Sequence, residues 1–113
     1  MSSFNKDLLN ENFGDDKEIL EELVALFIQE APGMIAPIKS AIDANESSDL
    51  RLYAHTFKGA VSNFFAEKCV EYSLELEMMG KNGTIDSDRA KELVSSLEAE
   101  LEVLSKDLKE FVS

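Results

Sequence analysis

The sequence has few of the residues from which cofactor and metal sites are usually built. Among 113 residues there is one cysteine, Cys69, and one histidine, His55. Neither an internal disulfide nor a zinc site rich in histidine or thiolate can therefore be assembled, and a lone cysteine fits a reducing compartment. No GxxxxGK[ST] phosphate loop is present either, because the glycines of Gly80-Lys81-Asn82-Gly83-Thr84 have the wrong spacing. These absences predict a chain that holds no metal or cofactor of its own and does not phosphorylate itself with ATP.

Basic residues and long apolar runs are also scarce. Eleven Lys and Arg against 23 Asp and Glu give a formal net charge of −12, which repels a nucleic-acid backbone or an anionic membrane. The longest apolar run is Leu23–Ile28, whereas a bilayer-spanning helix needs about 20 apolar residues. The segment Met1–Glu11 has no signal-peptide pattern. We therefore expect a small, acidic, cytoplasmic domain with neither a nucleic-acid nor a membrane partner.

The alternation typical of strands is missing, and apolar residues recur instead at spacings of three and four. Ser3 is expected to cap a short opening helix that Gly14 ends, and Asp15 with Glu18 resembles the capping box of the next helix. The apolar stripe of that next helix is Ile19, Leu20, Leu23, Val24, Phe27 and Ile28.

Two prolines complicate the continuation of this pattern. Pro32 punctuates the following stretch, and Pro37 lies inside it, so the helix there either begins near Pro37 or is kinked. The residues that continue the helical spacing are Ile35, Ile38, Ala41 and Ile42.

Three more helices are predicted downstream. Ser47 or Ser48 can cap the first, Gly80–Gly83 ends the second, and Asp86 or Ser87 opens the third. Their apolar stripes are Leu50, Phe57, Val61 and Phe64; then Ala66, Cys69, Tyr72, Ser73, Leu76 and Met79; then Ala90, Val94, Leu97, Leu101, Leu104, Leu108 and Phe111. The last stripe is a heptad repeat, which fits a coiled-coil dimer or, as we favour, a bundle helix that packs on its own chain. The prediction is an all-α, monomeric, antiparallel four-helix bundle with a short additional N-terminal helix, as one domain over residues 1–113.

The position of His55 on its helix is more informative than its identity. At 100° per residue, Arg51, Lys58 and Gly59 fall within about 60° of His55, and the apolar stripe lies on the opposite side. An ordinary surface histidine without a special role is one interpretation. The other is an exposed imidazole beside two cations, left uncovered by Gly59. Such an imidazole suits transient attachment of a dianionic phosphoryl group, because a pKa near 6.5 leaves a neutral, nucleophilic fraction.

The segment around this histidine resembles a known family. Ala54-His55-Thr56-Phe57-Lys58-Gly59-Ala60 is similar to the motif of histidine-containing phosphotransfer domains, in which lysine and glycine follow the histidine at three and four residues. Further similarity to the family pattern lies in Asp15-Asp16 before the Ile19–Phe27 segment, in Glu30-Ala31-Pro32, and in Leu76-Glu77 before Gly80-Lys81-Asn82-Gly83.

The resemblance implies a phosphocarrier in a multistep two-component phosphorelay, without a kinase catalytic site. Carried over to this chain, His55 would be the phosphoacceptor through Nε2, Lys58 would lie beside the phosphoryl group, and Gly59 would give the partner room to approach. Arg51 is a further candidate, for electrostatic support. The implied partners are response-regulator receiver domains and a hybrid sensor histidine kinase. Mg²⁺ is expected in the receiver and no cofactor in this chain.

The sequence departs from the family at one position and leaves two alternatives open. Phe65 stands where the family usually has a glycine, in a turn whose backbone a phenylalanine adopts only at a cost; it is expected to be a displaced core residue or a partner contact. One alternative is a docking module that is not phosphorylated. For it, the residues Val70, Leu74 and Met78 offer an apolar surface, although we expect them to complete a wide buried face.

The other alternative is a fragment of a histidine kinase. The dimerising hairpin of such a kinase is disfavoured because a proline is expected there a few residues after the histidine, and Thr56–Phe64 contains none. The phosphotransfer module of a chemotaxis-type kinase stays open.

Overall fold

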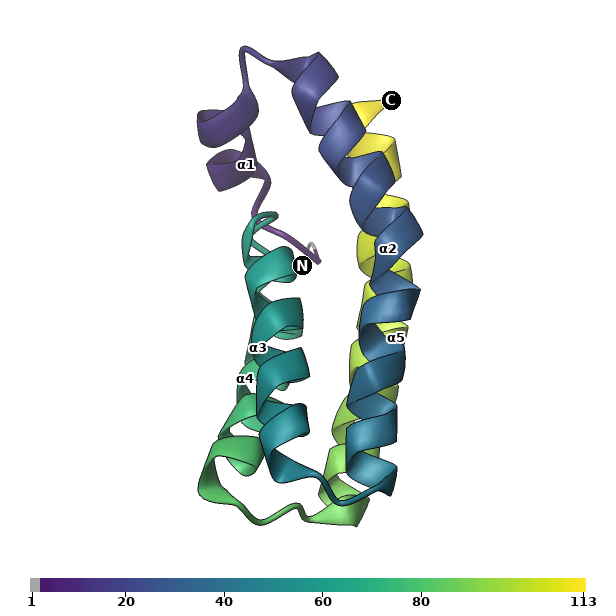
Figure 1. The fold of residues 1–113 in the computed structure, drawn as a ribbon. Helices are drawn as coiled ribbons and strands as arrows, with labels where there is room; N and C mark the ends of the chain where they lie inside the picture. Colours follow the sequence, from purple (N-terminus) through teal and green to yellow (C-terminus); the bar gives the residue numbers. More distant parts are fainter. Residues whose placement is uncertain (1–2) are drawn as a thin grey trace.

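The computed structural model describes residues 3–113, which form helices and no strand. The elements are α1 (Lys6–Phe13), α2 (Lys17–Asp43), α3 (Ser47–Ser62), α4 (Glu67–Asn82) and α5 (Ser87–Val112). In Figure 1, α2 and α5 lie side by side, α3 and α4 form the opposite pair, and α1 sits at the end of the bundle where the C-terminus also lies. The predicted all-α bundle with a short N-terminal helix is confirmed. Residues 1 and 2 of the predicted domain, and of the segment searched for a signal peptide, lie outside the described part.

The core is built from one face of each long helix. The heptad positions of α5 are buried against α2 and α4, apart from the half-buried Phe111. Because this seam is occupied within the chain, the structure favours a bundle helix over a coiled-coil dimer. The oligomeric state in solution stays a prediction.

Helix α2 is continuous through both prolines, so the interruption expected at Pro32 and the helix start considered near Pro37 are wrong. A proline within a helix removes one backbone hydrogen bond to the carbonyl four residues earlier. Here Ala31, Ile35 and Ile38 are buried on the core side of the same turns. Their burial holds the helical path where local propensity alone would end it.

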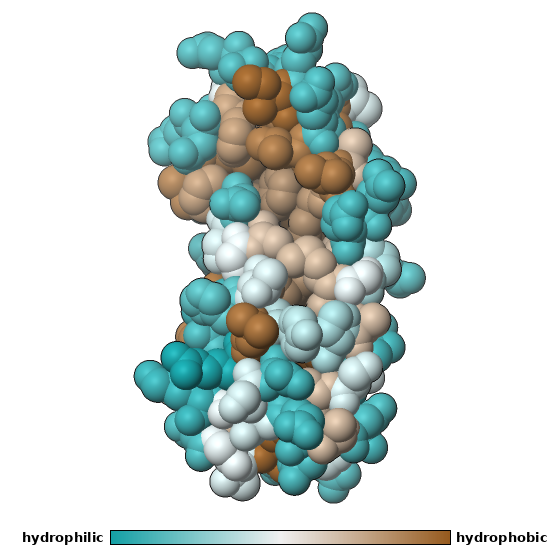
Figure 2. All heavy atoms as spheres, in the orientation of Figure 1, coloured by the Kyte–Doolittle hydropathy of each residue, from teal (hydrophilic) through white to brown (hydrophobic). Residues whose placement is uncertain are grey.

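The N-terminal half of α2 buries less than its sequence pattern indicates. Ile19 is 46% exposed and Leu23 is also exposed, so their assignment to the core stripe is wrong, whereas Leu20 and Val24 are buried. Helix α3 ends at Ser62, and at this end α2 is accompanied by the short α1 and by the C-terminal end of α5. Figure 2 shows apolar surface gathered over this end of the molecule. None of the helices within residues 3–113 combines the length and the apolar character needed to cross a bilayer.

The helix starts follow the predicted sites only in part. Asn5, not Ser3, caps α1, with its side chain accepting from the Leu8 N–H at 3.1 Å. The Ser3 hydroxyl instead donates to Asp107 Oδ2 at 2.8 Å, which ties the N-terminal segment to α5. Asp86 caps α5 as predicted by accepting from the Arg89 N–H.

The remaining predicted caps concern α2, α3 and α4. Asp16 rather than Asp15 precedes α2, and Glu46 precedes α3 in place of either serine; neither makes a side-chain cap. Gly83 ends α4 with a φ of 78°, so the predicted stop there is correct. Short polar side chains thus marked the neighbourhood of the starts of α1, α2, α3 and α5 but did not identify every capping residue.

The turn between α3 and α4 keeps a shape that favours glycine although Phe65 occupies it. Phe65 has a φ of 56°, in the left-handed region, where a side chain is strained. Its carbonyl accepts the Asn5 N–H at 2.9 Å and its half-buried ring packs against the core. These contacts offset the strain and agree with the prediction of a displaced core residue.

Candidate functional site

The middle of α3 carries His55 on the side facing away from the core. Leu50, Ala54, Phe57 and Val61 are fully buried on the opposite side of the helix. The His55 side chain is 66% exposed. The helical pattern therefore predicted the direction of this side chain correctly, and the imidazole is accessible to a second protein.

Helix α4 lies unusually close to α3 because of a glycine. A Cβ at Gly80 would stand 2.5 Å from the backbone nitrogen of Arg51 and 2.6 Å from the carbonyl oxygen of Ser47. Ser73, two turns earlier on α4, is small and fully buried. The two backbones thus meet with almost nothing between them. This approach brings the intervening residue of α4, Glu77, beside His55.

Glu77 connects the two residues that the sequence motif singled out. Its Oε2 lies 3.0 Å from His55 Nδ1, and its Oε1 lies 2.6 Å from Lys58 Nζ. The Glu77 side chain is only 15% exposed, and Oε1 is shielded from solvent. The Lys58 ammonium is therefore the charge that compensates this carboxylate oxygen.

The electrostatic balance at Glu77 fixes its protonation state. Desolvation, the largest single effect, raises the pKa of Glu77, but hydrogen bonding and the charges of Lys58 and His55 together lower it below its usual value. The side chain is therefore a carboxylate at neutral pH. Because a carboxylate only accepts hydrogen bonds, His55 Nδ1 must be the donor. The neutral ring then keeps its lone pair on Nε2, the nitrogen that does not face Glu77.

The two remaining candidates from the sequence differ in their surroundings. Gly59 faces open space, since a Cβ there would meet nothing within 4 Å. Arg51 is exposed, and within residues 3–113 its side chain forms no ion pair. The structure thus joins His55 and Lys58 through Glu77, leaves Gly59 open beside them, and does not bring Arg51 into the cluster.

Other nucleophile and metal chemistry finds little support in the described residues. Burial, and secondarily the charge of Glu100, raises the pKa of the Cys69 thiol to about 12, so this thiol stays protonated and unreactive. Across residues 3–113, no group of three or more His, Cys, Asp or Glu side chains could hold a metal ion. The exposed imidazole of His55 is therefore the group of this site that a second protein can reach.

Apolar side chains flank the site on both helices. Leu52 on α3 and Leu74 and Met78 on α4 are exposed. The expectation that Val70, Leu74 and Met78 complete a buried face is therefore wrong for the last two, and Val70 is half-buried. Leu74 and Met78 lie next to Glu77 on α4, so a protein that reached His55 would meet apolar surface there.

Sequence reasoning missed Glu77 and the packing role of Gly80. Both entered only as part of a family resemblance, and neither was named as a site residue. The available signal was the spacing of Ser73 and Gly80, two small residues on one face of α4 with an acidic residue between them. Small residues at that spacing permit a close helix contact, and an acid within it needs a cation or donor on the facing helix.

Comparison with known proteins identifies the family and the fold of the chain. The family model described as "Hpt domain" matches residues 22–108. The crystal structure of histidine-containing phosphotransfer protein B (HptB) from Pseudomonas aeruginosa PAO1 is similar, with a TM-score of 0.87 and 24% sequence identity over 97% of this chain and 94% of that one. At that identity the likeness establishes the fold. No match was found among curated protein sequences.

Proposed function

The chain belongs to the Hpt domain family, the histidine phosphotransfer domains of two-component phosphorelays, and on that premise we propose that His55 is the residue that carries its phosphoryl group. The observation that supports this most directly is the exposed imidazole, whose Nδ1 faces the Glu77 carboxylate while Nε2 makes no hydrogen bond within residues 3–113. Proteins of this family are phosphocarriers and interact with the kinase and receiver domains of two-component systems.

The proposed reaction is a reversible exchange between an imidazole and a carboxylate. The Nε2 lone pair attacks the phosphorus of a receiver's aspartyl phosphate, the N–P bond forms, and the P–O bond to the aspartate breaks with release of its carboxylate. Nδ1 keeps its proton, so the phosphorylated ring is positively charged. Glu77 stabilises that charge from 3.0 Å. In the reverse direction, an aspartate of another receiver attacks the phosphorus and the N–P bond breaks.

Lys58 and Gly59 are assigned supporting roles. A lysine ammonium has three N–H donors, so Lys58 can stay paired with Glu77 and still donate to an oxygen of the phosphoryl group. Gly59 leaves the space through which a receiver approaches. Arg51 is assigned at most a distant electrostatic effect, since it makes no ion pair among the described residues.

The remaining expectations concern the partners. We assign the Mg²⁺ of the reaction to the receiver domain, where it would neutralise charge on the transferring group, and none to this chain. A hybrid sensor histidine kinase is the proposed upstream donor, and the chain is proposed to act as a monomer in the cytoplasm. The exposed Leu52, Leu74 and Met78 offer the receiver an apolar contact around His55.

The test is label transfer from a phosphorylated receiver to the purified chain. The parent chain should take up label that is stable to base and labile to acid, as phosphohistidine is, and His55→Gln should take up none. His55→Gln should change the free energy of unfolding by less than about 0.5 kcal/mol, because the residue is exposed. Thr56→Ala is the matched control, since the hydroxyl of this exposed neighbour donates to the Leu52 carbonyl of its own helix.

Two outcomes would count against the assignment. Retained uptake in His55→Gln would show that another residue accepts the phosphoryl group. A parent chain that binds the receiver but takes up no label would instead be a docking module.

A further inference from the structure

A second feature of the molecule lies away from the His55 site, between α2 and α5. A groove of about 650 Å³ runs along this pair of helices. Its floor is apolar and is formed by Ile28, Ala31, Ile35 and Leu101. Cavities of this size that are mostly apolar with a few polar groups are typical of small-molecule sites, and the space between bundle helices is one of their usual places.

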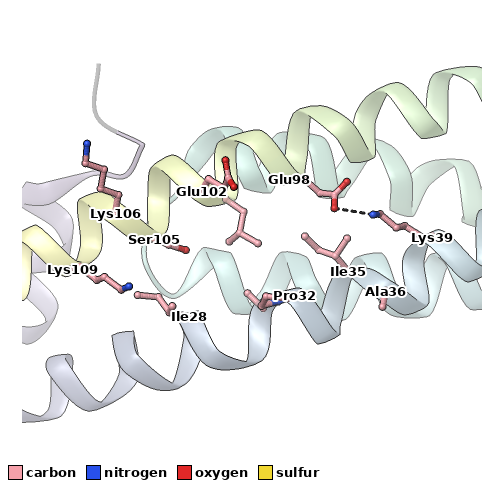
Figure 3. A pocket seen from close by; sticks show the side chains of 12 residues that line it. Ile28, Pro32, Ile35, Ala36, Lys39, Glu98, Glu102, Ser105, Lys106 and Lys109 are labelled. Atoms are coloured by element: carbon pink, nitrogen blue, oxygen red, sulfur yellow. Dashed lines mark ion pairs between the residues drawn. The ribbon is translucent and has the colours of Figure 1, made fainter.

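The groove exists because α2 presents short side chains where α5 passes. Ala31, Pro32 and Ala36 line the α2 side, and none of them reaches across to α5. The groove is bounded at one end by an ion pair between the two helices, Lys39 Nζ to Glu98 Oε2 at 2.8 Å (Figure 3). The span from Ile28 to Lys39 on α2 is about 16 Å long at 1.5 Å per helical residue.

The charges of the groove are distributed unevenly. Lys39 is neutralised by Glu98 and Glu102 also lines the groove, but Lys106 and Lys109 near the Ile28 end form no ion pair within residues 3–113. Figure 3 shows Lys109 reaching toward the space beside Ile28, while Lys106 points outward. The lining therefore holds three lysines against two glutamates, which is a local excess of positive charge in a chain with a net charge of −12.

This arrangement favours one class of occupant. We propose that the α2–α5 groove binds a free medium-chain fatty acid, with its carboxylate at Lys109 and its alkyl chain along Ile28, Ala31 and Ile35. A single terminal anion with an apolar remainder matches a groove that has Lys109 at one end and an apolar floor. A second copy of the chain would carry its own net charge of −12, which the net charge of the first copy repels. A helix of a partner protein would match the groove only if its acidic residues were confined to one end.

The proposal can be tested by titrating the full chain with dodecanoate below its micelle concentration. Saturable binding of one molecule is expected, with amide shifts in α2 and α5 and none at His55. Decanoate, two methylenes shorter, should bind about fifteenfold more weakly, at about fourfold per buried methylene. Dodecylamine, with the same chain and a cationic head, should not occupy the groove.

Two variants test the contact to the headgroup and the space in the groove separately. Lys109→Gln should weaken dodecanoate binding at least fivefold, and Lys68→Gln, on an exposed turn of α4, is the matched control that should change nothing. Ala36→Trp should block the groove from an exposed position. Thermal unfolding of each variant verifies folding.

Several results would overturn the proposal. They are equal binding of dodecylamine and dodecanoate, unchanged affinity in Lys109→Gln, or shifts that map to another face. Groove shifts caused by an acidic amphipathic peptide but not by dodecanoate would mean that the occupant is a protein helix. None of these results bears on transfer to His55, so the two proposals stand or fall separately.

Discussion

The two helix pairs of the bundle differ in how closely their backbones approach. Helices α3 and α4 meet at Gly80, where no room remains for a single methyl group. Between α2 and α5 no such backbone contact is found within residues 3–113, and the short side chains of Ala31, Pro32 and Ala36 leave a groove there. The close pair fixes Glu77 against His55 and Lys58 with little solvent between the charged groups. The open pair holds an exposed ion pair and an apolar channel. Spacing between helices, set by residue size, thus decides which pair can hold a rigid polar site.

Adding one methyl group to α4 where it contacts α3 is expected to have the largest effect on stability. Gly80→Ala should destabilise the protein by about 1–3 kcal/mol, because the new Cβ collides with the backbone of α3. Urea unfolding measures the change. The matched variant is Gly59→Ala, which meets nothing within 4 Å and should be neutral or stabilising by up to about 1 kcal/mol. Equal stability of both variants would mean that α4 does not contact α3 as described.

A larger side chain on the open surface beside His55 tests access rather than packing. Gly59→Gln should fold normally, because glutamine is a good helix former, yet obstruct the receiver one turn from His55. Transfer from a phosphorylated receiver should fall at least tenfold, equivalent to about 1.4 kcal/mol of transition-state stabilisation. Gly59→Ala should transfer nearly as fast as the parent. Undiminished transfer by Gly59→Gln would remove steric access as the reason for glycine at this position.

Removing one cation from each helix pair compares the two ion pairs by function. Lys58→Ala should slow transfer about two- to fivefold without preventing it, as expected for the loss of a partly exposed charge worth about 0.5–1 kcal/mol. Lys39→Ala breaks the exposed pair with Glu98 and should leave transfer unchanged. Single-turnover rates of the two variants measure the difference. A larger effect from Lys39→Ala would show that the α2–α5 pair, not the α3–α4 pair, supports the reaction.

The smallest expected effect concerns acid pH. Because the pKa of Glu77 is lowered in the folded protein, its carboxylate stabilises the fold above its unfolded pKa of about 4.3. That stabilisation is lost as the pH falls through the lower folded value. The parent should therefore exceed Glu77→Gln in stability at pH 7, by less than about 1 kcal/mol, and lose this advantage at an acid pH below the lowered pKa of Glu77.

Urea unfolding at both pH values gives this difference. Glu98→Gln, in the exposed pair of the open helices, provides the matched measurement. A parent advantage that grows on acidification would contradict the direction of the Glu77 shift.

Local sequence signals predicted the helical class, the buried stripes of α3 to α5 and the outward direction of His55. They predicted poorly where the burial of residues on successive helical turns decides the outcome. Pro32 and Pro37 read as helix interruptions because local propensity ignores the burial of Ala31, Ile35 and Ile38. The Asp15 and Ser3 caps failed because a cap depends on the path of the preceding chain, which propensity does not encode.

The sequence by itself determined which residues share a helix face, since residues three and four apart are fixed neighbours once the helix forms. That is why His55, Lys58 and Gly59 could be grouped without a structure. Only the tertiary structure decided that Glu77, 22 residues after His55, faces both side chains. Such a contact depends on the register and distance between two helices, and these follow from the packing of Gly80 against the α3 backbone.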